Sequence, residues 1–297
     1  MGDVLAGFHT VWEFDTDSVL IRFERGIRTP KLLQTLGERR VPYEAIAGVE
    51  LSPGRRGTVV LRAVPRPGAD PLMDVADGQL KEGCDPYRMV LPVQRERLAE
   101  YYAEEIRAVL DPLADQPAEE QLVAAPAPPL AFKAYDGKAS FDGTAVTFRW
   151  SRTGASSAKW KAGDQRFPVA ELCGVEWRSP ESLQGHLRLD RAAGPQAASS
   201  PRTPVDQDPA AVVFGMGYGL VHESLPFAAA VLEAVRAAGR TAPALTPEPP
   251  PVRVAVAPRS GPAEIADRIR QLGELHTAGL LTDDEFSAKK AQLLAEL

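Results

Sequence analysis

The chain has 297 residues, of which 44% are hydrophobic and 25% are charged, and its formal net charge is −6. This length predicts two domains with apolar cores. No apolar run approaches the roughly 20 residues that span a bilayer, and a negative net charge disfavours phosphate binding, so the composition argues against a transmembrane protein and a nucleic-acid binder. The N-terminus has an early acid and no basic segment, so we expect no secretory signal and a cytoplasmic location.

The first 110 residues predict a sheet followed by a helix. Apolar and polar side chains alternate over residues 19–23 and again over 57–62, which is the period of a half-buried strand. Residues 87–91 supply a later strand. Apolar side chains then recur every four residues and predict one helical stripe, at Leu98, Tyr102, Ile106 and Leu110.

The same pattern returns in the next half of the chain. Residues 14–23 align with 141–150, and Gly37–Glu50 aligns with Gly163–Glu176. Both copies then have a Gly-led strand and an Asp-Pro pair before a later strand. The helical spacing is repeated at Phe227, Val231 and Val235. Four matches in the same order indicate a tandem duplication, in which insertions fall in loops.

Proline-rich segments separate the two copies from each other and from the C-terminal part. Proline favours extended chain, and the second of these linkers is the richer in it. Two Gly- and Pro-rich stretches inside the copies, 65–83 and 192–209, are expected to be loops. The predicted parts are a first unit (1–111), a linker (112–130), a second unit (131–240), a Pro-rich linker (241–261) and a helical hairpin (262–297).

The last part predicts two short helices joined by a turn. Pro262 suits the first turn of the first helix, Gly279 ends that region, and Thr282 with Glu285 forms a capping box for the second helix. A hairpin of about 35 residues has too small a core to be stable alone. We expect its apolar face to bury against its own chain or another copy, through Ile265, Ile269, Leu272, Phe286, Leu293 and Leu297.

The hairpin also carries a family pattern. Apolar residues of its first helix precede the turn Gly279-x-x-Thr282-x-x-Glu285-Phe286, and Lys289-Lys290 is followed by Leu293-Leu294. In this spacing and order the segment resembles the SHOCT domain, a short C-terminal module of bacterial proteins. Members of that family are attached to other domains and are associated with oligomerisation, so the resemblance implies a role in association.

A second family pattern covers most of residues 1–240. A Pro precedes a Gly-Val-Glu strand in both copies, at Pro42 with Gly48–Glu50 and at Pro168 with Gly174–Glu176. The copies resemble the tandem repeats of actinobacterial proteins grouped as domain of unknown function 4429 and, more distantly, the bacterial pleckstrin-homology (PH-like) fold. The resemblance implies an α+β fold of two tandem PH-like units, each an antiparallel sheet or open barrel capped by a C-terminal helix, plus the C-terminal two-helix hairpin. It brings no catalytic residues, and it favours an assembly role by analogy.

No motif of an enzyme or a metal site stands out in the sequence. Cys84 and Cys173 are isolated and are interpreted as reduced packing thiols, and the four histidines lack metal-ligand spacing. The Gly-rich segment 215–219 follows a strand but opens no G-x-G-x-x-G helix, so it predicts a hairpin turn. We therefore expect no enzymatic activity, no catalytic residue, no metal and no cofactor.

Basic residues concentrate in the first copy. Between Arg22 and Arg66 ten basic side chains stand against four acidic ones. If the strand-end loops bring them to one rim, they form a site for an anionic headgroup or an acidic segment. The alternative is a solvated surface balanced by the acidic helix that follows. The candidates for such a site are Arg25, Arg28, Arg39, Arg40, Arg55 and Arg56.

These patterns favour a non-enzymatic cytoplasmic assembly or adaptor protein. Its tandem PH-like units would bind partners and its SHOCT-like hairpin would mediate association, so we expect a homo-oligomer or a protein partner and no nucleic acid. The alternative is a peripheral binder of anionic lipid headgroups or acidic ligands through the arginine-rich first copy, which keeps a membrane surface open as a partner. An enzyme of unrecognised type is the third and weakest alternative.

Overall fold

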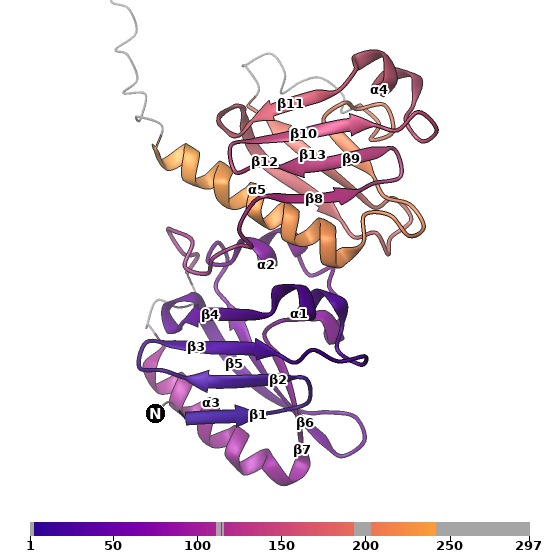
Figure 1. The fold of residues 1–297 in the computed structure, drawn as a ribbon. Helices are drawn as coiled ribbons and strands as arrows, with labels where there is room; N and C mark the ends of the chain where they lie inside the picture. Colours follow the sequence, from indigo (N-terminus) through magenta and orange to yellow (C-terminus); the bar gives the residue numbers. More distant parts are fainter. Residues whose placement is uncertain (1–2, 111–113, 115, 193–202, 242–297) are drawn as a thin grey trace, which may run out of the picture. The chain divides into compact units, whose positions relative to one another are not determined.

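Both copies of the repeat fold into two antiparallel sheets and a C-terminal helix (Figure 1). The computed structural model describes residues 3–110, 114, 116–192 and 203–241, which belong to one compact unit ending at Thr241. The predicted C-terminal hairpin lies outside the described residues, and so do its six association candidates.

The first copy has a four-stranded sheet in the order β1-β2-β3-β4 and a three-stranded sheet in the order β5-β6-β7. The strands of the larger sheet are β1 (Asp3–Ala6), β2 (Thr10–Phe14), β3 (Ser18–Phe23) and β4 (Glu38–Pro42). Those of the smaller sheet are β5 (Ile46–Pro53), β6 (Thr58–Pro65) and β7 (Arg88–Pro92). Helix α3 (Glu96–Val109) follows β7 and packs on the smaller sheet. Two short helices are inserted between strands, α1 (Lys31–Leu36) after β3 and α2 (Pro71–Ala76) after β6.

The second copy repeats this topology. Its larger sheet has the order β8-β9-β10-β11 and its smaller sheet the order β12-β13-β14. The larger sheet consists of β8 (Leu130–Lys133), β9 (Gly137–Phe141), β10 (Ala145–Trp150) and β11 (Gln165–Pro168). The smaller sheet consists of β12 (Leu172–Arg178), β13 (His186–Arg191) and β14 (Ala211–Val213). Helix α4 (Ser157–Ala162) precedes β11, and the C-terminal helix is α5 (Val221–Thr241). The predicted α+β arrangement of two tandem PH-like units is confirmed.

Irregular features recur at matching positions of the two copies. Pro42 and Pro168 end β4 and β11, and a 3₁₀ turn follows each of them. Proline has no amide hydrogen to donate, so it suits the end of a paired strand. The strand after each turn then has a one-residue register shift, between Ile46 and Gly48 in β5 and between Leu172 and Gly174 in β12. Such agreement in irregular geometry supports a common origin of the copies.

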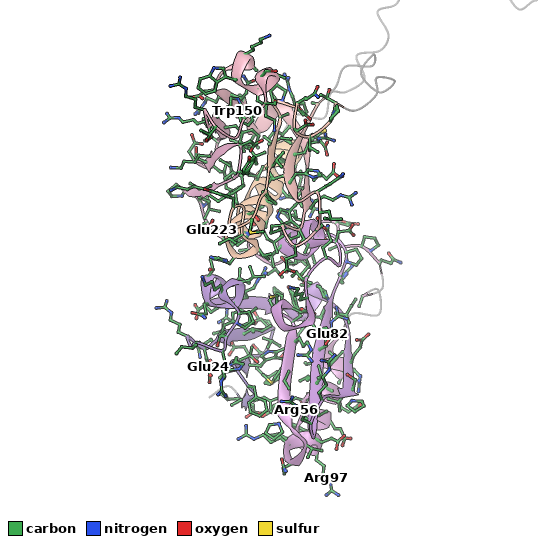
Figure 2. The ribbon with its side chains drawn as sticks, turned by 90° about the vertical axis from the view of Figure 1, so that its right-hand side faces the viewer. Glu24, Arg56, Glu82, Arg97, Trp150 and Glu223 are labelled. Carbon is green, nitrogen blue, oxygen red and sulfur yellow. The ribbon has the colours of Figure 1, made fainter. Side chains whose placement is uncertain are left out.

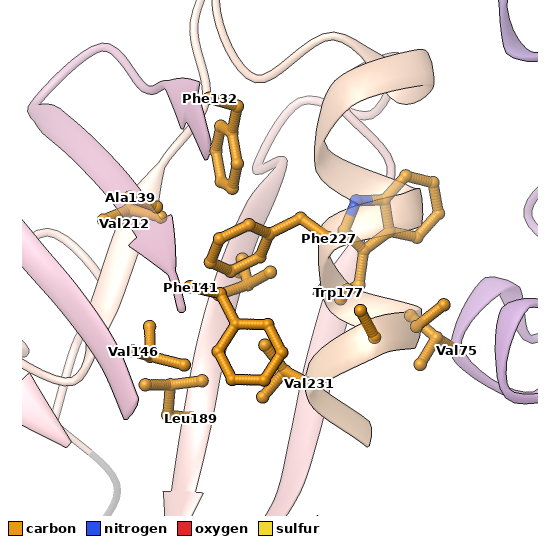
Figure 3. Packing of buried hydrophobic residues seen from close by; sticks show 14 of the residues in the cluster. Val75, Phe132, Ala139, Phe141, Val146, Trp177, Leu189, Val212, Phe227 and Val231 are labelled. Atoms are coloured by element: carbon orange, nitrogen blue, oxygen red, sulfur yellow. The ribbon is translucent and has the colours of Figure 1, made fainter. Parts of the chain in front are cut away.

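Two hydrophobic clusters form the cores of the described residues. Trp12, Leu61 and Ile106 are fully buried in the first cluster. In the second, Phe141 and Phe132 both meet Phe227 of α5 edge to face, with ring centroids 6.2 Å and 5.0 Å apart (Figure 3). Edge-to-face contacts of this kind add to the stabilisation by apolar burial.

The structure corrects the prediction of a loop over residues 65–83, because this stretch contains a buried helix. Leu72, Val75 and Ala76 of α2 are buried and belong to the core cluster of the second copy. Figure 3 shows Val75 on the same side of α5 as Trp177. The stretch was expected to be a loop because six residues are too few to show helical periodicity. Asp70 caps this helix through a bond from the Leu72 amide, and Pro71 occupies its first turn.

The predicted stripe on α3 is confirmed except at Leu98, which is 42% exposed. Tyr102 and Ile106 are buried, and Leu110, which follows the last helical residue, packs partly buried against the same core. Ala99 and Ala103 complete the buried face. No helix within the described residues is long and apolar enough to cross a membrane.

Candidate interaction surfaces

Arg39, one of the six arginines predicted at an anionic site, is buried. Its side chain is 4% exposed, and its Nη2 donates to Oδ1 of Asp70 over 2.8 Å. Asp70 also accepts a hydrogen bond from the Tyr87 hydroxyl at 2.7 Å. This network joins β4, the start of α2 and the segment before β7. Arg39 is therefore a structural residue, and its assignment to an exposed rim was wrong.

The other five arginines are exposed but occupy separate parts of the first copy. Arg40 is engaged by Asp15, with Nη1 and Oδ2 2.6 Å apart. Arg25 and Arg28 lie in the segment between β3 and α1, whereas Arg55 and Arg56 lie in the β5–β6 turn. Glu24, which precedes Arg25, and Arg56 are apart in Figure 2. The structure does not gather the six predicted side chains into one cluster.

Arg55 lines a groove of about 810 Å³ beside the smaller sheet of the first copy. The other basic side chains that line it are Arg62 and Arg88, and the acidic ones are Glu50, Glu82 and Asp85. Arg62 Nε donates to Asp85 Oδ2 over 2.9 Å. Because acids and bases alternate in this groove and pair with each other, it has no strong preference for an anion.

A second groove on the first copy, of about 600 Å³, has acidic and aromatic walls. It lies where the start of β1, the β2–β3 turn and α3 meet. We call it the acidic groove and define it by the residues that line it, which are Asp3, Phe14, Asp15, Thr16, Asp17, Tyr43, Tyr102, Glu105 and Val109. Four of these nine side chains are carboxylic acids and none is basic.

The floor of the acidic groove is an aromatic pair. The rings of Phe14 and Tyr102 stack with centroids 4.3 Å apart and an interplanar angle of 4°. Burial, and then the charge of Asp3, raises the pKa of Tyr102. Val109, which lines the groove, is about half exposed, and so is Tyr101, whose ring meets that of Tyr102 edge to face. Exposed apolar side chains beside a concave acidic surface are typical of a binding site for another protein segment.

The second copy has a surface of opposite charge. A hollow of about 470 Å³ lies at the β8–β9 turn and the end of β10. Its basic side chains are Lys133, Lys138 and Arg149, and none of the residues that line it is acidic. Exposed aromatic and thioether side chains stand beside them. We call this surface the basic patch and define it as Lys133, Tyr135, Lys138, Arg149, Met216 and Tyr218.

A buried ion pair supports the basic patch from below. Lys159 Nζ lies 2.6 Å from Asp136 Oδ2, and both side chains are almost fully buried. Lys159 also lies over the Trp150 ring, 5.0 Å from its centroid. Burial lowers the pKa of Lys159, and the charge of Asp136 opposes this effect. Asp136 accepts the Val213 amide as well, so the β8–β9 turn is tied to β14.

The Gly-rich segment 215–219 forms the tight turn that the sequence predicts. The Tyr218 amide donates to the Gly215 carbonyl over 2.9 Å. Gly217 and Gly219 have φ angles of 81° and 65°, which glycine adopts without strain. The turn presents Met216, which is fully exposed, and brings Tyr218 to Tyr135, with ring centroids 6.4 Å apart.

Both thiols are free, as predicted. Cys84 packs against the core of the second copy, but Cys173 is exposed, so its interpretation as a packing thiol was wrong. Burial raises the pKa of Cys84, which keeps its thiol protonated. In the part of the chain that the structure describes, no group of three His, Cys, Asp or Glu side chains is placed to hold a metal ion.

Both charged surfaces escaped prediction from the sequence. Tyr135 and Tyr218 come from opposite ends of the second copy, and Asp3 meets Glu105 only because α3 returns to the first strand. A partial signal existed in the Asp15-x-Asp17 turn and in Lys133 and Lys138, which flank a short hairpin.

The comparison with protein families finds the same two copies that the fold shows. The family described as Domain of unknown function (DUF4429) matches residues 12–107 and 139–232, which together make up more than half of the chain. The family described as Short C-terminal domain (SHOCT) matches residues 267–294. No curated protein matches the chain.

Proposed function

This chain belongs to the DUF4429 family and carries a SHOCT segment, and from that premise we propose that it is a non-enzymatic assembly or adaptor protein of the cytoplasm. Its PH-like units act as protein-binding modules, and its C-terminal hairpin links copies or partners to one another.

One observation carries this proposal, the helix α2 that the first copy inserts against the second. Leu72, Val75 and Ala76 of α2 are buried against α5 and β12. Gln79 then bonds to the backbone at the end of β12, donating to the Trp177 carbonyl at 3.1 Å and accepting the Ser179 amide at 3.0 Å. Protein interfaces likewise combine buried apolar side chains with specific hydrogen bonds to the backbone.

Two ion pairs flank this contact. Arg236 Nη1 lies 2.6 Å from Asp74 Oδ2, and Lys81 Nζ lies 2.7 Å from Glu181 Oε1. The second PH-like unit thus holds a helix of the first unit through α5 and β12, and this contact supports a role in protein binding. The hairpin supplies the second part of the proposal, because a segment of its length needs an apolar partner to be stable.

Light scattering on point variants of the hairpin tests the proposal. We expect Leu272→Asp with Leu293→Asp to lower the mass of the assembled chain, because a buried charge opposes apolar association. The matched control is Gln271→Asp with Ala291→Asp, which adds the same charges off the apolar stripe. Equal masses for both pairs of variants and the parent chain would remove the hairpin from the proposal.

A further inference from the structure

We propose that the acidic groove of one molecule binds the basic patch of another molecule of the same chain. The contact is directional, because it joins the first PH-like unit of one molecule to the second PH-like unit of the next. This inference rests on the proposed assembly function and assigns the surfaces that carry it.

Charge is the first argument for this pairing. The acidic groove is lined by Asp3, Asp15, Asp17 and Glu105 without a basic side chain, and the hollow of the basic patch has the reverse composition. Each surface keeps some local compensation, since Arg40 pairs with Asp15 and Arg149 lies 3.8 Å from Asp164. The remaining charges are opposite in sign, and opposite potentials favour encounter and fix the register of a complex.

Apolar complementarity is the second argument. Tyr135, Met216 and Tyr218 stand exposed on the basic patch. The acidic groove is concave and offers the stacked Phe14–Tyr102 pair as its floor. Tyrosine and methionine are enriched at interfaces, where an apolar body is buried while a polar end finds a partner. A cationic side chain beside an aromatic floor gains a further attraction.

Internal bonds hold parts of both surfaces in place, which reduces the entropy that binding costs. The basic patch is held by the buried Lys159–Asp136 pair and by the 215–219 turn. In the acidic groove, the Tyr43 hydroxyl donates to the Asp15 carbonyl over 3.1 Å, and Asp15 is bonded to Arg40. Preorganised surfaces of this kind bind with little rearrangement.

Neither surface takes part in the contact between the two copies of the repeat. That contact uses α1, α2, β12, α5 and the residues that bond to Gln79 and Lys81. Every molecule therefore presents one acidic groove and one basic patch at the same time. A contact between two different surfaces is heterologous, so it propagates into chains or closes into rings rather than stopping at a dimer.

The test uses the full-length chain in two charge-reversed forms, compared by sedimentation velocity at low salt. The groove variant is Asp17→Lys with Glu105→Lys, and the patch variant is Lys133→Glu with Lys138→Glu. These four side chains are exposed, which keeps the effect on folding small. We expect each variant to self-associate at least tenfold more weakly than the parent chain. Controls of the same charge change are Glu119→Lys with Glu120→Lys and Arg25→Glu with Arg28→Glu.

Mixing the two variants makes the test specific. The groove variant keeps an intact basic patch, and the patch variant keeps an intact acidic groove. The native contact can therefore form only between the two variants. In the equimolar mixture the reversed groove of one variant also meets the reversed patch of the other. The mixture should therefore recover an association that neither variant shows alone, with the two variants alternating. A chain that carries all four substitutions has both surfaces reversed in sign, and it should recover self-association, which a folding defect would not allow.

Three results would overturn the inference. The first is parent-like association of both variants, and the second is failure of the mixture and the four-fold variant to recover association. The third is binding of the patch to anionic vesicles, with phosphatidylglycerol in phosphatidylcholine as the probe, by a chain that stays monomeric. If the hairpin variants abolish association while the charge-reversed variants do not, the proposed assembly function stands and this contact falls.

Discussion

Arg39 and Asp70 form a buried ion pair in the first copy, with Nη2 and Oδ1 2.8 Å apart. Its neighbour Arg40 bonds to Asp15 at the surface. The two arginines are adjacent in β4, and side chains alternate between the faces of a strand, so one is buried and the other is exposed. The pair allows a direct comparison of buried and exposed electrostatics in one strand.

We expect Asp70→Ala to lower the free energy of unfolding by about 3–5 kcal/mol, because it leaves the Arg39 charge buried without its partner. The matched change Asp15→Ala removes a largely solvated pair and should cost far less, because water screens exposed charges. Urea denaturation measures both. Equal costs would mean that the Arg39–Asp70 pair is not buried as described.

Tyr87 predicts how stability changes at alkaline pH. Burial, and then the charge of Asp70, raises the pKa of Tyr87 well above its ordinary value of 10.0. Above about pH 10 the unfolded chain releases this proton and the folded chain keeps it, so the free energy of unfolding falls as pH rises. In Tyr87→Phe this contribution is absent, and stability should fall less steeply between about pH 9 and 11.

The same variant should cost about 1–3 kcal/mol at neutral pH, because Asp70 Oδ2 loses its hydrogen bond from the Tyr87 hydroxyl. Tyr101→Phe, an exposed position, is the control. A parent-like alkaline slope for Tyr87→Phe would contradict the buried position of the phenol.

Adjacent leucines of α1 report on different cores. Leu32 belongs to the core cluster of the second copy and Leu33 to that of the first. Each change to Ala should cost about 2–5 kcal/mol, since both side chains are buried. Hydrogen exchange should quicken in β12 and α5 for Leu32→Ala, and in the strands of the first copy for Leu33→Ala. The same exchange pattern in both variants would refute the division into two cores.

Repetition made much of the fold predictable. The alignment of Arg40 with Arg166 was visible in the sequence, and the structure gives it a cause. Arg166 bonds to Asp142 just as Arg40 bonds to Asp15, so both copies tie the strand before the 3₁₀ turn to the preceding hairpin turn. Thr144 and Ala145 also donate to Asp142, and these bonds lower its pKa.

Long-range partners were not predictable. Asp70, the carboxylate that pairs with Arg39, lies 31 residues further along the chain, in an insertion that the sequence predicts as a loop. Helix α2 has a proper cap at Asp70, but it is too short for a periodic pattern, and its partner helix α5 lies in the other copy. The charged surfaces are assembled from such distant segments, which composition and spacing do not connect.

The mass of the full-length chain in solution tests the assembly function most directly. Light scattering should give a mass above the 32.0 kDa of one chain, and this mass should rise with protein concentration as contacts between molecules form. A mass that stays at 32.0 kDa from low to high micromolar concentration would contradict self-assembly.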